Sequence, residues 1–183
     1  MKLTEYLVHE GLVAPDDLLR RDVCMLFGGG CWRSFFFLGV MRDLQKRFPP
    51  DVLRTWAFTG ESAGTVFAIA MAIGCPWQHV EELSCRMAAE ARAHPLGLLG
   101  RGRSIAGAML QALLDWLPED ELVAALRGRF ALTLNTVALT ADGLGLRTWL
   151  ATDFESREEL FEAVLGSGNI PLFSSVSHLE AIG

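Results

Sequence analysis

The sequence FTGESAG, residues 58–64, decides how the first half of this chain folds. It follows the apolar run RTWAF (54–58) and leads directly into TVFAIAMAI (65–73), which predicts a strand that turns sharply into a helix. The stretch matches G-x-S-x-G, a turn in which two glycines relieve crowding while backbone strain holds the serine hydroxyl out toward a carbonyl group. Ser62 is therefore the candidate nucleophile, and the elbow around it consists of Gly60, Glu61, Ala63 and Gly64.

Length and composition favour one globular domain that acts on something other than nucleic acid. The chain has 183 residues, of which 51% are hydrophobic and 21% are charged, so it can bury a sizeable core. Its formal net charge is −6, whereas phosphate binding needs clustered Lys and Arg. The densest basic stretch, 101–103, is interpreted as a solvated loop, and we expect no nucleic-acid partner.

Several features predict a cytoplasmic protein that is not secreted. The N-terminal segment carries acids from Glu5 onward and has no apolar run typical of a signal peptide. The uncharged run 62–80 contains glycine and proline, so we interpret it as a core helix and a turn, not as a membrane span. The four cysteines form no C-x-x-C pair, and Cys24 and Cys85 are expected to be reduced and buried.

The order of elements predicts an α/β domain. Strands and helices alternate in the first half of the chain, and an Asp-Gly turn at Asp142 predicts a hairpin later. A capping box of Ser156 and Glu159 predicts one more helix. The expected strands cover 22–27, 54–58, 130–139 and 144–152, and the expected helices cover 34–48, 62–73, 76–93 and 105–117.

This pattern is typical of a sheet with helices on both faces, so we expect a three-layer α/β/α domain with a central, mostly parallel sheet. Residues 1–21 are expected to form a helical lead-in, and 22–183 the domain itself. The apolar run 35–38 is expected to pack in the core instead of forming a membrane-contact patch. Trp116 is likewise expected in the core, and His79 on the surface.

A second glycine-rich loop precedes the elbow. FGGGCWRS (27–34) follows the strand 22–27 and opens the helix 34–48, about thirty residues before Ser62. Glycines let backbone N–H groups approach a ligand oxygen, and a helix N-terminus favours negative charge. The loop is therefore suited to stabilise the oxyanion that forms when a serine attacks an ester.

Together, these motifs resemble the patatin-like acyl hydrolases, in the branch of adipose triglyceride lipase and adiponutrin. The resemblance covers most of 22–183. It rests on GGGCWRS, on GESAG, on PLGLLGRGRS, on the hairpin before FESREEL, and on SGNIPLF, which is similar to the S-x-x-I-P-x-F stretch of the family.

The resemblance implies a Ser–Asp dyad without a catalytic histidine, a cofactor or a metal ion. Ser62 would attack an acyl ester of a triacylglycerol or phospholipid. The amides of Gly29, Gly30 and Cys31 would bind the oxyanion, and Arg33 matches a basic residue found in this loop. It also implies peripheral contact with a lipid droplet or membrane surface.

The chain departs from the family pattern at three points. The mildest is Ser34, which stands where the family more often has glycine but is a good helix N-cap. Cys31 stands where the family more often has glycine, and a Cβ there costs on the order of 1 kcal/mol if the position needs a positive φ. The dyad Asp belongs to an Asp-Gly-Gly or Asp-Gly-Ala motif beyond the Ile-Pro, and none of the twelve residues after Pro171 is Asp. We therefore expect a domain that is incomplete at its C-terminus, and a poor catalyst in residues 1–183 alone.

Two alternatives stay open. An ordinary α/β-hydrolase would combine Ser62 with Asp142 or Asp153 and with His178, which is the chain order that this fold requires. The chain could also be a catalytically silent, truncated or regulatory relative that binds lipid without turning it over.

Overall fold

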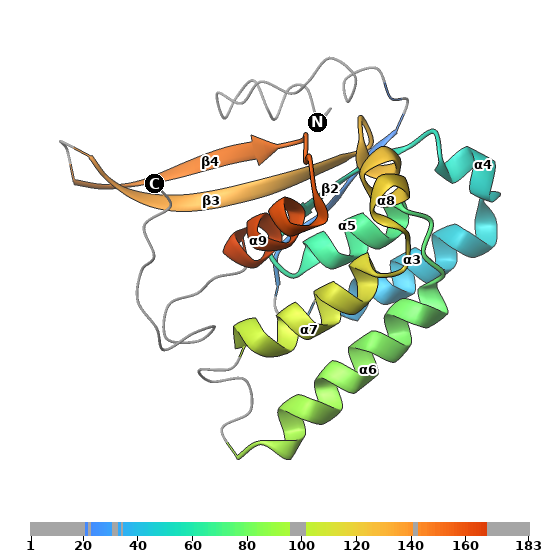
Figure 1. The fold of residues 1–183 in the computed structure, drawn as a ribbon, viewed down its shortest axis with the longest axis horizontal. Helices are drawn as coiled ribbons and strands as arrows, with labels where there is room; N and C mark the ends of the chain where they lie inside the picture. The colour runs from blue at the N-terminus through green and yellow to red at the C-terminus, as the bar shows by residue number, and fades with distance from the viewer. Residues whose placement is uncertain are drawn as a thin grey trace.

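A computed structural model of the chain describes residues 21, 23–30, 33, 35–95, 102–140 and 143–167 (Figure 1). Its centre is a four-stranded sheet in the order β1-β2-β3-β4, in which β1, β2 and β3 are parallel and β4 is antiparallel to β3. The predicted α/β class with a mostly parallel sheet is confirmed. The strands are β1 (Cys24–Phe27), β2 (Ala57–Glu61), β3 (Phe130–Thr140) and β4 (Gly143–Ala151).

Strand register brings the two glycine-rich loops to the same end of the sheet. Phe27, the last residue of β1, pairs with Gly60, and Gly60 also pairs with Leu132 of β3. Because β1 and β2 are parallel, the loop after Phe27 and the elbow after Glu61 leave the sheet side by side.

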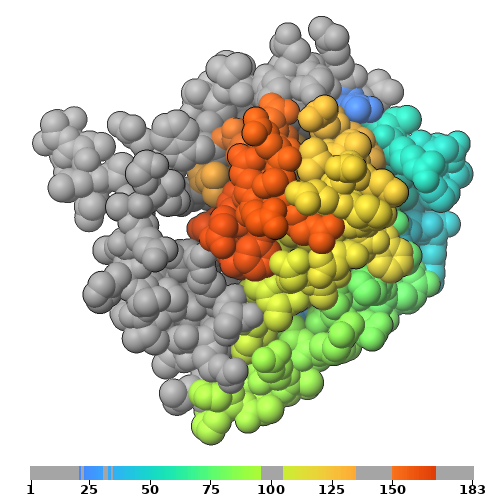
Figure 2. Space-filling model, in the orientation of Figure 1, coloured from blue at the N-terminus to red at the C-terminus, as the bar shows by residue number. Residues whose placement is uncertain are grey.

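The described helices pack on one face of the sheet (Figure 1), with α5 in direct contact with β1, β2 and β3. In Figure 2, α9 and α8 lie next to each other on the visible surface, above α7 and α6. The described residues contain one helical layer, and the expected helical lead-in over 1–21 falls outside the described residues except for Arg21. The helices are α3 (Phe36–Arg47), α4 (Pro50–Leu53), α5 (Gly64–Ala72), α6 (Trp77–Ala93), α7 (Gly102–Leu114), α8 (Glu119–Leu126) and α9 (Arg157–Ser167).

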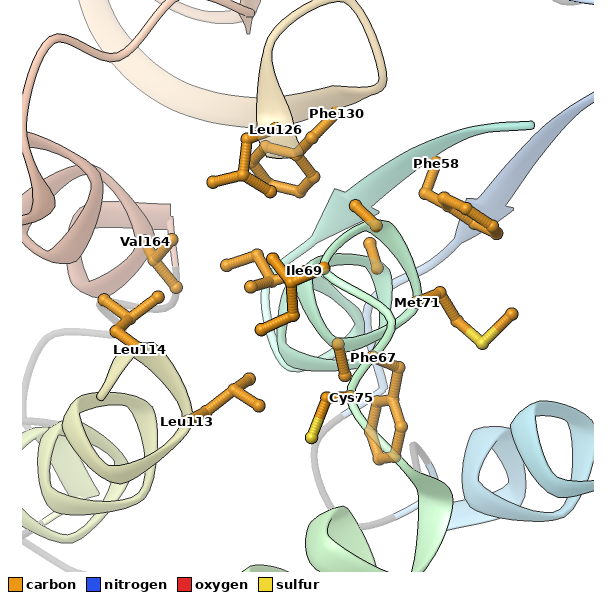
Figure 3. Packing of buried hydrophobic residues seen from close by; sticks show 14 of the residues in the cluster. Phe58, Phe67, Ile69, Met71, Cys75, Leu113, Leu114, Leu126, Phe130 and Val164 are labelled. Carbon is orange, nitrogen blue, oxygen red and sulfur yellow. The ribbon is translucent and has the colours of Figure 1, made fainter. Parts of the chain in front are cut away.

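Helix α5 is the centre of the core. Nearly all of its residues are buried, which fits a sequence that is apolar around the whole helix. Figure 3 shows Ile69 of α5 between side chains from α7, α8, α9 and the strands, among them Leu113, Leu126 and Phe130. None of the described helices is both long enough and apolar enough to cross a bilayer.

The opposite face of the sheet carries smaller buried side chains. Ala57 and Ala131 are buried there, together with parts of Cys24 and Leu150. The Thr59 hydroxyl donates a hydrogen bond of 3.0 Å to the Ala131 carbonyl, so this buried polar group has a partner.

Most predicted elements are present, but three differ from the sequence-based prediction. The second strand begins at Ala57 instead of Arg54, because Pro50 begins the short helix α4, where a proline in the first turn loses no hydrogen bond. The second difference is α8, which was not predicted at all. The third difference is the expected loop 94–104, which is shorter because α7 begins at Gly102.

The hairpin and the capping box are confirmed. Strand β4 pairs along its whole length with residues 132–140 of β3, although Asp142 itself lies outside the described residues. The Glu159 amide donates to the Ser156 hydroxyl at 3.1 Å, and the Glu159 carboxylate accepts from the Glu155 amide at 2.7 Å. The return bond therefore reaches one residue earlier than in the standard capping box.

Four burial predictions were wrong. Phe36 is 73% exposed, because α3 packs on α5 and α6 through its other faces, whereas its neighbour Phe37 packs edge-on against Phe27. Trp116 is 41% exposed, and His79, expected on the surface, is half-buried with its ring 4.8 Å from that of Trp116. Cys85, expected to be buried, is exposed.

Arg129 ties three elements together where the chain enters β3. Its guanidinium donates to the carbonyls of Ala72 at 2.6 Å, Leu53 at 3.1 Å and Trp56 at 3.4 Å. These carbonyls lie at the ends of α5 and α4 and before β2. Burial, with the nearby charges of Arg21 and Arg54, lowers the pKa of Arg129.

We predict that Arg129→Met lowers the free energy of unfolding by about 3 kcal/mol, because three carbonyls lose a charged donor. Arg127→Met, a change at an exposed position two residues away, should cost no more than about 0.5 kcal/mol. Urea unfolding followed by circular dichroism measures both. Equal stability of the two variants would contradict the bracing role of Arg129.

Candidate functional site

The elbow joins β2 to α5 through a strained serine. Ser62 has a φ of 50°, and it is the one non-glycine residue with positive φ in the part of the chain that the structure describes. The Thr65 amide donates to the Ser62 carbonyl at 3.0 Å, and Ala63 stands at the N-cap of α5. A positive φ in a residue with a Cβ costs energy and often marks a functional turn.

Both elbow glycines are required by close backbone contacts. A Cβ on Gly60 would lie 2.4 Å from the Thr65 Cα, in the first turn of α5. A Cβ on Gly64 would lie 2.2 Å from the Phe27 carbonyl oxygen and 2.4 Å from that of Gly28. These distances leave no room for a side chain at either position. Because both residues are glycine, α5 can pack directly against the ends of β1 and β2.

The glycine-rich loop lies against the elbow. The point where a Cβ on Gly29 would lie is 3.4 Å from the Ser62 Cβ, and Gly29 and Gly30 are both exposed. The Arg33 amide donates to the Gly30 carbonyl at 2.9 Å, which closes a tight turn before α3, and the Arg33 side chain is exposed. Cys31, the third predicted oxyanion residue, lies outside the described residues.

Ser167 contacts the elbow, which the sequence analysis did not foresee. Ser167 is the last residue of α9, and its hydroxyl accepts a hydrogen bond from the Ser62 amide at 3.2 Å. The same hydroxyl donates to the Thr133 carbonyl of β3 at 2.9 Å. Ser167 is also the first residue of the S-x-x-I-P-x-F stretch, and this was the one signal in the sequence that pointed to it.

Two acids that precede α9 are engaged away from Ser62. Arg157, the first residue of α9, donates from its guanidinium to Asp115 at 2.6 Å and from its amide to Glu119 at 3.1 Å. Ser167 stands at the other end of this 11-residue helix, about 15 Å away at the usual helical rise. Within the described residues, no carboxylate is hydrogen-bonded to the Ser62 hydroxyl.

Register also separates Asp153 from the elbow. Ala151 of β4 pairs with Leu132, and the chain then continues toward the start of β3, away from the end where Ser62 lies. The Asp153 carboxylate accepts a hydrogen bond from the Thr152 hydroxyl at 3.3 Å. This argues against a triad through Asp153, and the other proposed members, Asp142 and His178, lie outside the described residues.

Burial disfavours two cysteines as nucleophiles. It raises the pKa of Cys24 to about 11 and that of Cys75 to about 12. A thiol with such a pKa carries almost no thiolate, the reactive form, at neutral pH. Ser62, on its strained turn, is therefore the better candidate.

Comparison with known proteins points in the same direction as these motifs. The chain is 27% identical over 150 residues to the mouse protein named 1-acylglycerol-3-phosphate O-acyltransferase Pnpla3, covering 82% of this chain and 35% of that protein. It is 23% identical over 156 residues to human PNPLA3, which carries the same acyltransferase name, covering 85% of this chain and 31% of that one.

A third relative is human patatin-like phospholipase domain-containing protein 2, 28% identical over 147 residues, with 80% of this chain and 28% of that protein covered. The chain thus spans about a third of the length of the curated relatives it matches. No protein-family profile matches the chain, and no solved structure matches it significantly. The similarities support a relationship to patatin-like proteins of lipid metabolism.

We predict that Ser167→Ala lowers the rate at which a fluorophosphonate labels Ser62 by about tenfold, because the strained elbow loses the bond that holds its amide. Ser167→Thr, which keeps the hydroxyl, should restore most of the rate. Ser156→Ala is the matched control, since it removes a helix cap at the far end of α9 and costs about 1 kcal/mol of stability. A similar loss of labelling in both alanine variants would mean that Ser167 acts through stability alone.

Proposed function

We propose that this chain is an acyl hydrolase of the patatin-like kind, in which Ser62 attacks the ester carbonyl of a lipid. The observation that carries the proposal is the position of the glycine-rich loop, where a Cβ on Gly29 would lie 3.4 Å from the Cβ of a serine with positive φ, which stands between two glycines that tolerate no side chain. Sequence similarity to proteins named for lipid acyl chemistry supports the same conclusion.

The proposed reaction has two steps. The Ser62 Oγ bonds to the ester carbonyl carbon while its proton passes to a base, and the alcohol leaves with a proton, which gives an acyl-serine. Water then attacks the acyl-serine, gives up a proton, and releases the fatty acid while Ser62 regains its hydrogen. In both steps, the carbonyl oxygen carries negative charge that the amides of Gly29, Gly30 and Cys31 are proposed to stabilise.

The acceptor in the second step decides between hydrolysis and acyl transfer. Water gives a lipase or phospholipase, whereas the hydroxyl of a second glycerolipid gives an acyltransferase. The names of the relatives include both kinds of activity. The exposed position of Gly29 and Gly30 supports hydrolysis, because water then has access to the acyl-serine.

A catalytically silent lipid-binding protein is the second candidate. It is favoured by one observation, that no described carboxylate is bonded to the Ser62 hydroxyl. A serine hydroxyl needs a base within about 2.6–3.2 Å to react at a useful rate. The Ser–Asp dyad proposed by resemblance would need an Asp from outside the described residues.

We predict that a fluorophosphonate probe labels Ser62, and that Ser62→Ala abolishes both this labelling and ester hydrolysis. The protein tested should include whatever sequence its gene encodes after Gly183. Mass spectrometry of the labelled peptide identifies the site. Labelling that is equal in the Ala variant would eliminate Ser62 as the nucleophile, and labelling without turnover would favour the silent candidate.

His178→Ala serves as the mechanistic control in the same experiment. A dyad uses no histidine, so this variant should keep its activity within about threefold of the parent, whereas loss of a triad member costs about a thousandfold or more.

We also propose that the protein contacts a lipid surface near the glycine-rich loop. Phe36, 73% exposed, stands at the first position of α3, one turn after the exposed Arg33. An exposed aromatic ring beside a cationic side chain suits the boundary between water and lipid. Contact at this point would bring an ester close to Ser62.

We predict that Phe36→Ala weakens binding to phospholipid-coated triacylglycerol emulsions by about tenfold, the effect of removing one buried aromatic side chain. Hydrolysis of a soluble short-chain ester should not change. Val52→Ala, at an exposed apolar position on α4, is the control and should bind normally. Flotation of the emulsion measures binding, and equal binding by the Phe36 and Val52 variants would contradict this surface.

A further inference from the structure

An arginine cluster, formed by Arg21, Arg54 and Arg129, stands where the three parallel strands begin. Arg21 comes just before β1, Arg54 just before β2 and Arg129 just before β3. The first residue of β1 pairs with the first residue of β2, and the first residue of β3 pairs with the second of β2. Neighbouring strands lie about 4.8 Å apart, so the three strand starts fall within about 10 Å of one another.

Backbone contacts hold two members of this arginine cluster in place. The Arg21 Nε donates a hydrogen bond of 3.2 Å to the carbonyl of Gly128, the residue before Arg129. The Arg129 guanidinium donates at 3.1 Å to the carbonyl of Leu53, the residue before Arg54. Burial, and then the charges of Arg21 and Arg54, lower the pKa of Arg129, so the three positive charges lie close enough to repel one another.

Acidic side chains do not neutralise the arginine cluster. Among the described residues, no carboxylate forms an ion pair with any of its three members. Asp51, the acid nearest to Arg54 in sequence, is exposed and forms no ion pair with it. Arg54 is exposed, and in the described part of the chain its guanidinium has no hydrogen-bond partner. Clustered positive charges without a counter-charge favour the binding of an anion.

We propose that the arginine cluster is a binding site for the phosphate group of a ligand. A phosphate carries up to two negative charges and several acceptor oxygens, which suit more than one guanidinium fork, whereas a carboxylate is satisfied by a single fork. Since Arg21 and Arg129 are already fixed by carbonyl groups, binding orders few side chains. The net charge of −6 makes a nucleic acid a poor source of this phosphate.

The proposed phosphate site is separate from the elbow. Ser62 follows the last residue of β2, and Arg54 precedes the first, so the length of this 5-residue strand, about 16 Å, separates them. A phosphate bound here would connect the chain before β1 with the end of α4 and the start of β3. Binding should therefore stabilise the fold, and it does not depend on the reaction proposed for Ser62.

The test titrates the full chain with inorganic phosphate and with methyl phosphate at constant ionic strength. Isothermal titration calorimetry should give a Kd on the order of 100 μM for the better of the two ligands. A hundredfold excess of that ligand over its Kd should raise Tm by about 5 °C or more. Sodium chloride at the same ionic strength should produce neither effect.

Arg54→Gln should weaken phosphate binding by about tenfold or more, because a charged donor is lost. Arg54→Lys keeps the charge but not the planar fork and should have an intermediate Kd. Arg92→Gln makes the same charge change at an exposed position in the last turn of α6 and should bind within about twofold of the parent. Without phosphate, Arg54→Gln should be as stable as the parent, which excludes misfolding as the cause of weaker binding.

Vesicles distinguish the two sources of such a phosphate, a soluble ligand and a lipid headgroup. Binding of methyl phosphate that Arg54→Gln weakens assigns a soluble ligand. Binding only to phosphatidylcholine vesicles that contain about 20% phosphatidic acid, again weakened by Arg54→Gln, assigns a headgroup.

Three results would overturn the proposed phosphate site. The first is the absence of heat, of a Tm shift and of vesicle binding at about 10 mM phosphate. The second is equal binding by the parent and Arg54→Gln. The third is a Glu-rich peptide that binds more tightly than either phosphate and loses this binding in Arg54→Gln, since the arginine cluster would then dock a protein. None of these measurements uses ester hydrolysis, so failure of the proposed function leaves this inference unaffected.

Discussion

The close approach of α5 to the ends of β1 and β2 is the constraint on which the site depends. The helix can come this close because residues 60 and 64 are glycines. A Cβ at either position would lie 2.2–2.4 Å from backbone atoms. The first turn of α5 can then sit directly against the carbonyls of Phe27 and Gly28. A methyl group at either glycine would have to separate elements that form the centre of the core.

The arrangement of Ser62 follows from this approach. The chain has to reverse within two residues to pass from β2 into α5, and Ser62 adopts a φ of 50° to do so. The same crowding brings the loop after β1 against the turn, so Gly29 meets Ser62 although the two are far apart in sequence. Ser167 adds a hydrogen bond to the strained amide across 105 residues. Segments from three parts of the chain thus meet at Ser62.

Much of this fold could be predicted from local sequence, and the exceptions have physical reasons. The strand–turn–helix around Ser62 and the β3–β4 hairpin depend on turn residues and apolar patterns that act locally. Helix α8 was not predicted from the sequence, although acids in its first turn, Glu119 to Glu121, favour a helix start. Exposure of Phe36 depends on which helices cover α3, and periodicity does not reveal this.

The contacts of Ser167 and Glu61 could not be predicted for a different reason, since each depends on strand register between distant segments. Within the elbow, a side chain at position 60 or 64 would clash with backbone atoms, and Ser62 carries the hydroxyl that is proposed as the nucleophile. Alternation along β2 turns the side chain at position 61 away from α5 and toward Gly29. The side chain at position 61 therefore lies outside the core that α5 forms and beside the glycine-rich loop.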